Sequence, residues 1–239
     1  MTGAGGGAVA VVPVRGLVGG KTRLAGTLGA EMREALTRRM LRGVVDAALD
    51  SGRIDAVAVI SPDAAALAFA AALNPRVVPI VQSPAAPGLD AAADAGRDWA
   101  NGTGAAAMLV LFGDLPLLTA GDVAGLLDDD APVVLAPDRH GAGTNALVLR
   151  LAVTGAGAFR FQYGAGSYAR HRAEGGRLGL AVATRVAPGT ADDLDTPADW
   201  ARLIDTREWL GEDLAATRVA ACPTGHGCLA DDLARREPA

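Results

Sequence analysis

Short hydrophobic runs alternate with helical segments between residues 8 and 136, and this alternation restricts the possible folds more than any other feature. The runs are short enough and rich enough in β-branched residues to be buried strands, and the segments between them have helical periodicity. Strands without in-and-out alternation, separated by helices, predict a mostly parallel sheet with helices on both faces. We therefore expect an α/β, Rossmann-like domain. The expected strands are 8–14, 56–60, 76–81, 107–112 and 133–136, and the expected helices are 31–49, 64–73, 89–100 and 119–127.

The pattern becomes less regular after Asp138. Segments 145–151, 167–174 and 180–186 predict a small inserted hairpin or edge strands, although Ser167 and His171 also have the four-residue spacing of one helix face. A last helix is expected over 197–204. We expect one domain over residues 1–204 and a C-terminal extension over 205–239, partly helical and then mobile.

Composition excludes several classes of function. A net charge of -5 argues against a large nucleic-acid-binding surface, which needs a concentrated basic patch. The longest apolar run, 64–73, is far shorter than the roughly 20 residues of a membrane-spanning helix. The first residues lack the basic start of a signal peptide, so we expect a cytoplasmic protein with no membrane partner.

Lysine occurs once, at Lys21, among 22 basic residues. An ammonium is a compact point charge with three donors, and the planar fork of arginine does not replace it at a phosphate. Lys21 lies in a glycine-rich loop directly after the first expected strand, and backbone N–H groups of such loops can approach an anion. The loop suits a triphosphate, although an ordinary flexible turn is the alternative and the P-loop pattern fails because Arg15 stands where glycine is required. The candidate residues are Arg15, Gly16, Gly19, Gly20, Lys21 and Arg23.

Three aspartates form a candidate metal site. Asp114 follows the strand at 107–112, where ligands bind in open α/β sheets. Asp193 and Asp195 are two residues apart, so in an extended segment both project to one side. Clustered carboxylates are costly without a cation, and Mg²⁺ prefers such ligands. Asp195 or Thr196 could instead serve only as the cap of the following helix.

Taken together in this order, the motifs resemble those of the 2-phospho-L-lactate/phosphoenolpyruvate guanylyltransferase family, whose product is the guanylated precursor of the deazaflavin coenzyme F(420). The resemblance covers residues 8–204 and implies a single nucleotidyltransferase-type domain. The matching segments are Lys21-Thr22-Arg23-Leu24, Gly113-Asp114-Leu115-Pro116-Leu117, Ala136-Pro137-Asp138-Arg139, 141–147, 163–167 with Arg170-His171, and Asp193-Leu194-Asp195-Thr196-Pro197.

The resemblance also implies roles for individual residues. GTP and a small phospho-acid would be the substrates, with one or two Mg²⁺ on Asp114, Asp193 and Asp195, and with Arg15, Lys21 and Arg23 stabilising the departing pyrophosphate. The family usually has asparagine where this chain has Asp90, which replaces a side chain that can donate with one that only accepts. The phospho-acid would be held at Thr144, Gly164 and Ser167, and the nucleotide at Gly16, Gly19, Gly20, Lys21, Gly88 and Asp90.

Several alternatives stay open at this point. A nucleotidyltransferase of the same architecture could act on a sugar phosphate, an alditol phosphate or the molybdenum cofactor, and a non-catalytic nucleotide-binding module could keep the fold. The sequence does not choose among phosphoenolpyruvate, 2-phospho-L-lactate and 3-phosphoglycerate, and it leaves open a homodimer built through the region after Asp138. Cys222, His226 and Cys228 offer only three soft ligands, whereas a structural zinc site normally has four. His140 and His171 lie near the expected acid pocket in sequence.

Overall fold

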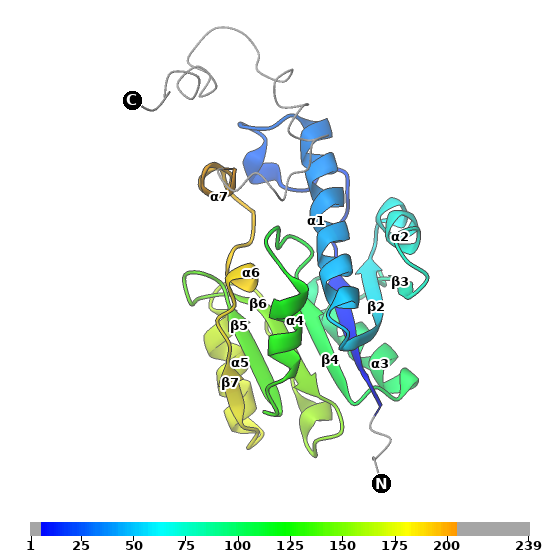
Figure 1. Cartoon of the computed structure of the whole chain (residues 1–239), viewed down its shortest axis with the longest axis vertical. Coiled ribbons are helices and arrows are strands. Elements are labelled where there is room, and N and C mark those ends of the chain that lie inside the picture. The colour runs from blue at the N-terminus through cyan, green and yellow to red at the C-terminus, as the bar shows by residue number, and fades with distance from the viewer. Residues whose placement is uncertain (1–5, 205–239) are drawn as a thin grey trace, which may run out of the picture.

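A computed structural model describes residues 6–204 and shows one seven-stranded sheet between two layers of helices (Figure 1). The strand order is β3-β2-β1-β4-β6-β5-β7. Every strand is parallel to the others except β6, which is antiparallel to both β4 and β5. The predicted α/β class with a mostly parallel sheet is therefore confirmed. The strands are β1 Ala8–Pro13, β2 Ile54–Ser61, β3 Val77–Val81, β4 Ala107–Leu111, β5 Val133–Pro137, β6 Thr144–Arg150 and β7 Val182–Thr184.

The helices cover both faces of this sheet. Helices α1, α2 and α4 pack on one face, and α3 and α5 pack on the other (Figure 1). Along β1, Ala10 and Val12 pack into the hydrophobic core on the side of α1, α2 and α4, whereas Val9 and Val11 pack into the core on the side of α3 and α5. Because both faces of the strand are buried, it has no polar face. The helices are α1 Ala30–Asp50, α2 Ala64–Ala71, α3 Leu89–Thr103, α4 Ala120–Leu127, α5 Ser167–Arg177, α6 Pro188–Ala191 and α7 Pro197–Leu203.

The segments after Asp138 differ from the prediction. The first segment, 145–151, does not lie at an edge of the sheet. It forms most of β6, which lies between β4 and β5 and pairs with β5 as a hairpin within the main sheet. The second segment, 167–174, is not a strand but part of helix α5, as the four-residue spacing of Ser167 and His171 indicates. The buried face of α5 carries Ser167, His171, Glu174 and Gly175. Because three of these four residues are polar, hydrophobic periodicity does not reveal the helix. The third segment, 180–186, contains the edge strand β7. Helix α6 was not predicted.

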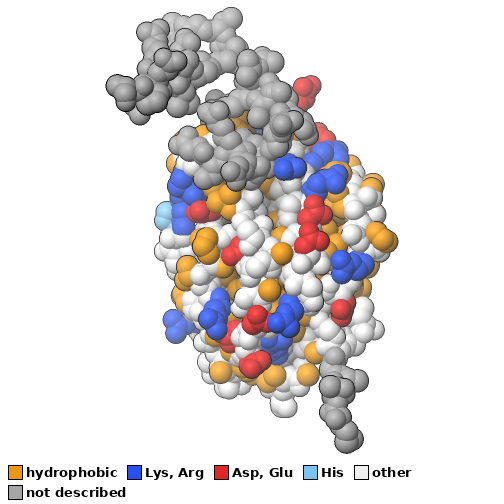
Figure 2. All heavy atoms as spheres, viewed as in Figure 1, with side chains coloured by type: hydrophobic (Ala, Val, Ile, Leu, Met, Phe, Trp, Pro, Cys, Tyr) orange, Lys and Arg blue, Asp and Glu red, His pale blue; other side chains and the backbone are white. Residues whose placement is uncertain are grey.

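Residues 205–239, with the predicted extension and with Cys222, His226 and Cys228, lie outside the described residues. On the face shown in Figure 2, acidic and basic side chains of the described residues are interspersed. None of the helices described between residues 6 and 204 is both long enough and apolar enough to cross a membrane.

Candidate active site

The single lysine lies at the carboxyl end of the sheet in an unusual backbone conformation. Lys21 has φ 52°, the only positive φ of a non-glycine residue between residues 6 and 204. A left-handed conformation costs a side-chain-bearing residue about 1–2 kcal/mol, and such strain persists only where the surroundings hold it. The loop before Lys21 is fixed by Asp63, the N-cap of α2, which accepts the N–H of Leu17 at 2.9 Å.

Two of the three predicted aspartates hold the ammonium of Lys21. Lys21 Nζ donates to Asp114 Oδ2 at 2.6 Å and to Asp195 Oδ1 at 2.8 Å. Burial alone would lower the pKa of Lys21, but the two carboxylates outweigh it, so its pKa is raised. The ammonium is therefore a permanent cation that bridges residues 93 and 174 positions away in the sequence.

A small hydrophobic cluster brings these distant segments together. Leu24, just after Lys21, and Leu194, between the two aspartates, are both fully buried in it. Because side chains alternate along an extended segment, anchoring Leu194 turns Asp193 and Asp195 to the opposite side. The N–H of Leu194 also donates to the carbonyl of Asp114 at 3.2 Å, which fixes the segment to the end of β4. The other members are Leu28, Met32, Leu36, Met40, Trp200, Leu203 and Ile204.

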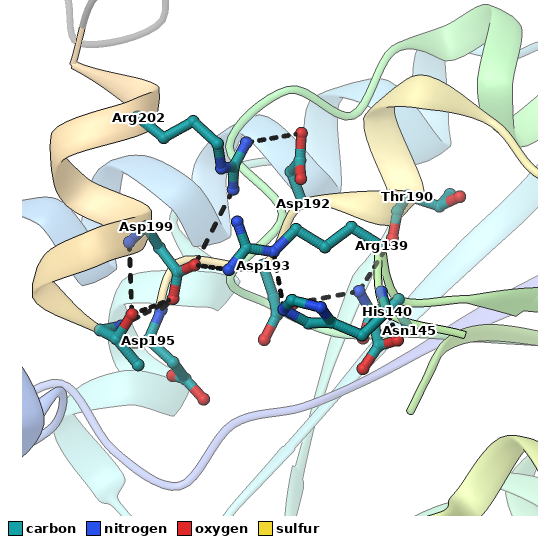
Figure 3. Close-up of polar contacts among 11 residues, drawn as sticks. Arg139, His140, Asn145, Thr190, Asp192, Asp193, Asp195, Asp199 and Arg202 are labelled. Atoms are coloured by element: carbon teal, nitrogen blue, oxygen red, sulfur yellow. Dashed lines mark hydrogen bonds and ion pairs between the residues drawn. The ribbon is translucent and has the colours of Figure 1, made fainter. Parts of the chain in front are cut away.

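Helix α7 fixes the other side of the acidic segment (Figure 3). Thr196 is its N-cap and forms a capping box with Asp199, and the N–H of Asp195 also donates to Asp199 Oδ2 at 3.2 Å. Arg139 contacts Asp199 Oδ1 at 2.8 Å. Burial opposes the shift, yet these donors lower the pKa of Asp199, so it stays an anion. Thus Thr196, rather than Asp195, caps the helix, and Asp195 is left free for Lys21.

Asp199 and Arg139 hold the acidic segment in place, and neither was predicted as a site residue. The spacing of Thr196 and Asp199, three residues apart before an apolar turn, is the sequence signal of a capping box and could have identified Asp199. No comparable signal marks Arg139, because its contact depends on how the loop after β5 folds.

The third aspartate lies in a less favourable environment. Asp193 Oδ1 accepts from Asn145 Nδ2 at the long distance of 3.4 Å. Burial, together with Asp114 and Asp195, raises the pKa of Asp193. Asp114 Oδ1 is buried and has no hydrogen-bond partner among residues 6–204. The cluster therefore has acceptor oxygens in excess of the donors that these residues supply.

The predicted charged residues line one cleft of about 480 Å³. Lys21 and the three aspartates share it with Arg15, Arg23 and the loop glycines, so the structure brings these residues together. Between residues 6 and 204, however, no three acidic, histidine or cysteine side chains are arranged to hold a metal ion as they stand. The lining glycines of the loop are Gly16, Gly19 and Gly20.

A second space of about 360 Å³ adjoins the first and shares Arg15 and Leu89 with it. Gln82 and Gly88 line this space, and Gln82 Nε2 donates to the carbonyl of Gly88 at 2.7 Å. Asp90 does not line either space, and its Oδ1 accepts the N–H of Tyr163 at 2.6 Å. Asp90 thus joins the start of α3 to the segment before α5.

The residues expected to hold the phospho-acid also lie together, but outside the charged cleft. The N–H of Thr144 donates to Ser167 Oγ at 3.0 Å, and the N–H of Ser167 donates to the carbonyl of Gly164 at 3.0 Å. Thr144 and Ser167 are 1% and 2% exposed, whereas Gly164 lies at the surface. None of the three lines the charged cleft. Asn145, next to Thr144, connects the two regions through Asp193.

Solved structures share the fold. The chain aligns with a protein described as a nucleotide-diphospho-sugar transferase from Desulfovibrio desulfuricans at a TM-score of 0.68 and 20% identity, covering 84% of this chain and 87% of that one. It aligns with a nucleotidyl transferase from Methanothermobacter at a TM-score of 0.60 and 17% identity, covering 84% and 98%. At such identities the likeness establishes the architecture, which is that of the nucleotidyltransferases.

The sequence then defines the family within this class. Residues 8–206 match the model of the family described as guanylyl transferase CofC like, and the chain belongs to that family. A phosphoenolpyruvate guanylyltransferase from Rubrobacter xylanophilus is 42% identical over 197 residues, covering 81% of this chain and 92% of that relative. A 3-phospho-D-glycerate guanylyltransferase from Phenylobacterium zucineum is 38% identical over 197 residues, covering 80% and 87%.

Proposed function

We propose that this protein is a Mg²⁺-dependent guanylyltransferase that joins GMP from GTP to a small phospho-acid and releases pyrophosphate. The observation that carries the proposal is the bridge from Lys21 to Asp114 and Asp195, built at the mouth of a glycine-rich loop in one cleft. Family membership supports guanylyl transfer as the reaction.

The glycine-rich loop is suited to the triphosphate. Gly19 has φ 74°, and a Cβ there would meet nothing within 4 Å, so the backbone is open to an incoming anion. Arg15 and Arg23 are exposed at the two ends of the loop and would add positive charge near a polyanion. Lys21 would stabilise the charge that develops on the departing pyrophosphate, which is the dominant kind of contribution in such transfers.

The acidic cluster suits a hard divalent cation. Asp114, Asp193 and Asp195 offer carboxylate oxygens, and the buried Asp114 Oδ1 has no donor in the described part of the chain. Burial, together with the negative charge of Asp114 and Asp195, raises the pKa of Asp193. When bound there, Mg²⁺ would neutralise phosphate charge and polarise the reacting phosphoryl group. Lys21 compensates two of these carboxylates in the structure, and it would turn to the triphosphate once the carboxylates have another partner.

The reaction needs no general base. A phosphate oxygen of the acid, already anionic at neutral pH, forms a bond to the α-phosphorus of GTP. The bond from that phosphorus to the bridging oxygen breaks, and pyrophosphate leaves with the electron pair. The contribution of the chain is to bring two polyanions together and align them. The product is a diphosphate-linked guanosine adduct, the kind of precursor expected in deazaflavin coenzyme biosynthesis.

The two substrates would occupy different regions of the site. The region of Gln82 and Gly88 would receive the guanosine, since it adjoins the triphosphate loop through Arg15. Thr144, Gly164 and Ser167 would hold the phospho-acid beyond Asp193. Phosphoenolpyruvate and 3-phosphoglycerate, the acids in the names of the relatives, are the first candidates, with 2-phospho-L-lactate as the third.

Turnover assays test the proposal directly. The purified full chain is incubated with GTP and Mg²⁺ and, separately, with each of the three acids, and pyrophosphate release is measured. Mass spectrometry of the product identifies the adduct, and ATP and CTP replace GTP as matched controls. We expect adduct formation with one acid and GTP. Pyrophosphate release without any adduct, or no release with all three acids, would overturn the proposal.

A further inference from the structure

The buried histidine of α5 has a defined hydrogen-bonding arrangement. His171 is fully buried, and both ring nitrogens have partners. Nε2 accepts the backbone N–H of Gln162 at 2.9 Å, and Nδ1 lies 3.0 Å from Thr144 Oγ1. A backbone N–H can only donate, so Nε2 must carry the lone pair. A neutral ring then has its proton on Nδ1, and His171 donates to Thr144.

The surroundings of the ring keep it neutral. The rings of Phe159 and Tyr163 pack against it, with centroids at 6.0 and 4.8 Å. Burial lowers the pKa of His171 to about 4, Arg170 adds to this shift and Glu174 opposes it. Thr144 on β6 and the N–H of Gln162 complete the surroundings, and neither is ionisable.

This tautomer determines what the neighbouring hydroxyl groups can do. Thr144 Oγ1 accepts from His171, and Ser167 Oγ accepts the N–H of Thr144, so each hydroxyl hydrogen is left to donate elsewhere. Neither hydrogen has an acceptor within the described part of the chain. Donors without acceptors at a buried position are costly, and a phosphate or carboxylate oxygen would satisfy them.

The segment that carries Gly164 is held by the same helix. Arg170 donates to the carbonyls of Gln162, Tyr163 and Ala165, and His171 takes the N–H of Gln162. The loop and the two hydroxyls therefore keep one relative position. An anion bound between them would contact directed donors rather than a charge from the histidine.

We propose that His171 is a positioning residue that makes the hydroxyl of Thr144 a hydrogen-bond donor to the phospho-acid, through the proton on its Nδ1. This rests on the proposed function, since the phospho-acid is the anion concerned. In this arrangement His171 is neutral and gives the phosphate no positive charge.

Two substitutions separate this role from packing alone. His171→Asn retains an amide near the position of Nδ1 and can still donate to Thr144, whereas His171→Gln places its amide near Nε2 and serves Gln162 instead. We expect His171→Gln to raise the KM for the phospho-acid about tenfold, the effect of losing one hydrogen bond to a charged group, and to leave the KM for GTP within about twofold. His171→Asn should recover most of this loss. Thr144→Val and Thr144→Ser form a second pair, in which only the serine variant keeps the hydroxyl.

A spectroscopic measurement checks the tautomer without any turnover. The full chain, labelled with ¹⁵N in its 3 histidines, is compared with His171→Gln to assign the His171 signals. We expect a protonated Nδ1 and an unprotonated Nε2, with no titration between about pH 5.5 and 8. Melting temperatures of all variants show whether the fold is kept.

The outcomes are distinct. A proton on Nε2, a titration near pH 6.5, or equal effects of both histidine variants on the KM values for acid and GTP would overturn the role of His171. An inactive wild-type chain would instead remove the proposed function and this inference with it. An active wild type whose His171→Gln variant has an unchanged KM for the acid would overturn this inference alone.

Discussion

The two regions of the candidate site differ in charge and in burial. The charged region, made of Lys21, Asp114, Asp193 and Asp195, lines an open cleft and contains one ammonium against three carboxylates. The neutral region, made of Thr144, Ser167 and His171, is buried and carries no charge. Asn145 lies between them and contacts Asp193.

The difference lies in what each region leaves unsatisfied. Counted over the described residues, the charged region has more acceptors than donors, including Asp114 Oδ1, which has no partner there, and it would be completed by a cation. The neutral region has two hydroxyl hydrogens without acceptors in the same part of the chain and would be completed by an anion. Connected through Asn145 and Asp193, the two regions would together hold two phosphate-bearing substrates, with a cation held in the charged region and directed hydroxyl donors in the neutral region. Substitutions in the two regions should therefore affect different measurements.

The largest effect is expected at Asp114. Asp114→Asn keeps the size of the side chain but removes the charge that faces Lys21, so kcat for pyrophosphate release should fall about a thousandfold. The fold should persist, because Leu24 and Leu194 still anchor the two segments. Steady-state assays over a range of Mg²⁺ concentrations, with the melting temperature as control, measure this. Mg²⁺-dependent release at the wild-type rate would contradict the role of the charged region.

Lys21 should show the next largest effect. In Lys21→Arg the charge is kept, but a planar fork engages the two carboxylates bidentately and holds to them instead of reaching the triphosphate, so kcat should fall about a hundredfold. The matched control is the reverse substitution, Arg23→Lys, at an exposed position of the same cleft, and it should lower kcat much less. Equal losses in the two variants would show that the ammonium at Lys21 has no special position.

The neutral region should appear in the pH dependence of stability. The pKa of His171 is lowered to about 4 in the folded state, so the unfolded chain binds the extra proton between pH 6.5 and 4. The contribution of neutral His171 to the free energy of unfolding is fully present above pH 6.5. It decreases as the pH falls, by about 3 kcal/mol at pH 4. Urea unfolding of the wild type and His171→Asn across this range measures the difference. Parallel stability curves for the two proteins would show that the ring is not held neutral.

The two regions also differ in how far the sequence predicts them. The charged region follows from local features: a lone lysine in a glycine-rich loop, an aspartate after a hydrophobic strand, and an alternating Asp-Leu-Asp segment. Strands β1 to β5 are likewise predicted, because each contains a continuous apolar run. Roles for Thr144 and Ser167 came only from the resemblance, and the structure places them together without testing those roles.

The neutral region was less predictable for physical reasons. The buried face of α5 consists mainly of polar residues, so hydrophobic periodicity gave no sign of a packed helix. The state of His171 depends on a backbone N–H from Gln162, nine residues earlier, which no residue pattern encodes. The central, antiparallel position of β6 also depends on pairing, since a buried strand has the same composition in either direction.

The smallest expected effect distinguishes the cost of the charged region from its use. Burial and its acidic neighbours raise the pKa of Asp193, so the ionised carboxylate destabilises the fold at neutral pH. Asp193→Asn should raise the melting temperature by about 2 °C at pH 7, a modest gain because solvent screens a partly exposed group. The gain should shrink as the pH falls, since the folded wild type takes up this proton before the unfolded chain does.

Scanning calorimetry at several pH values gives the melting temperatures, and pyrophosphate release gives the activity, which should fall sharply. A variant that loses stability and activity together would mean that Asp193 serves the fold, whereas a gain in stability with a loss of activity shows that the charged region keeps an unfavourable carboxylate for its cation.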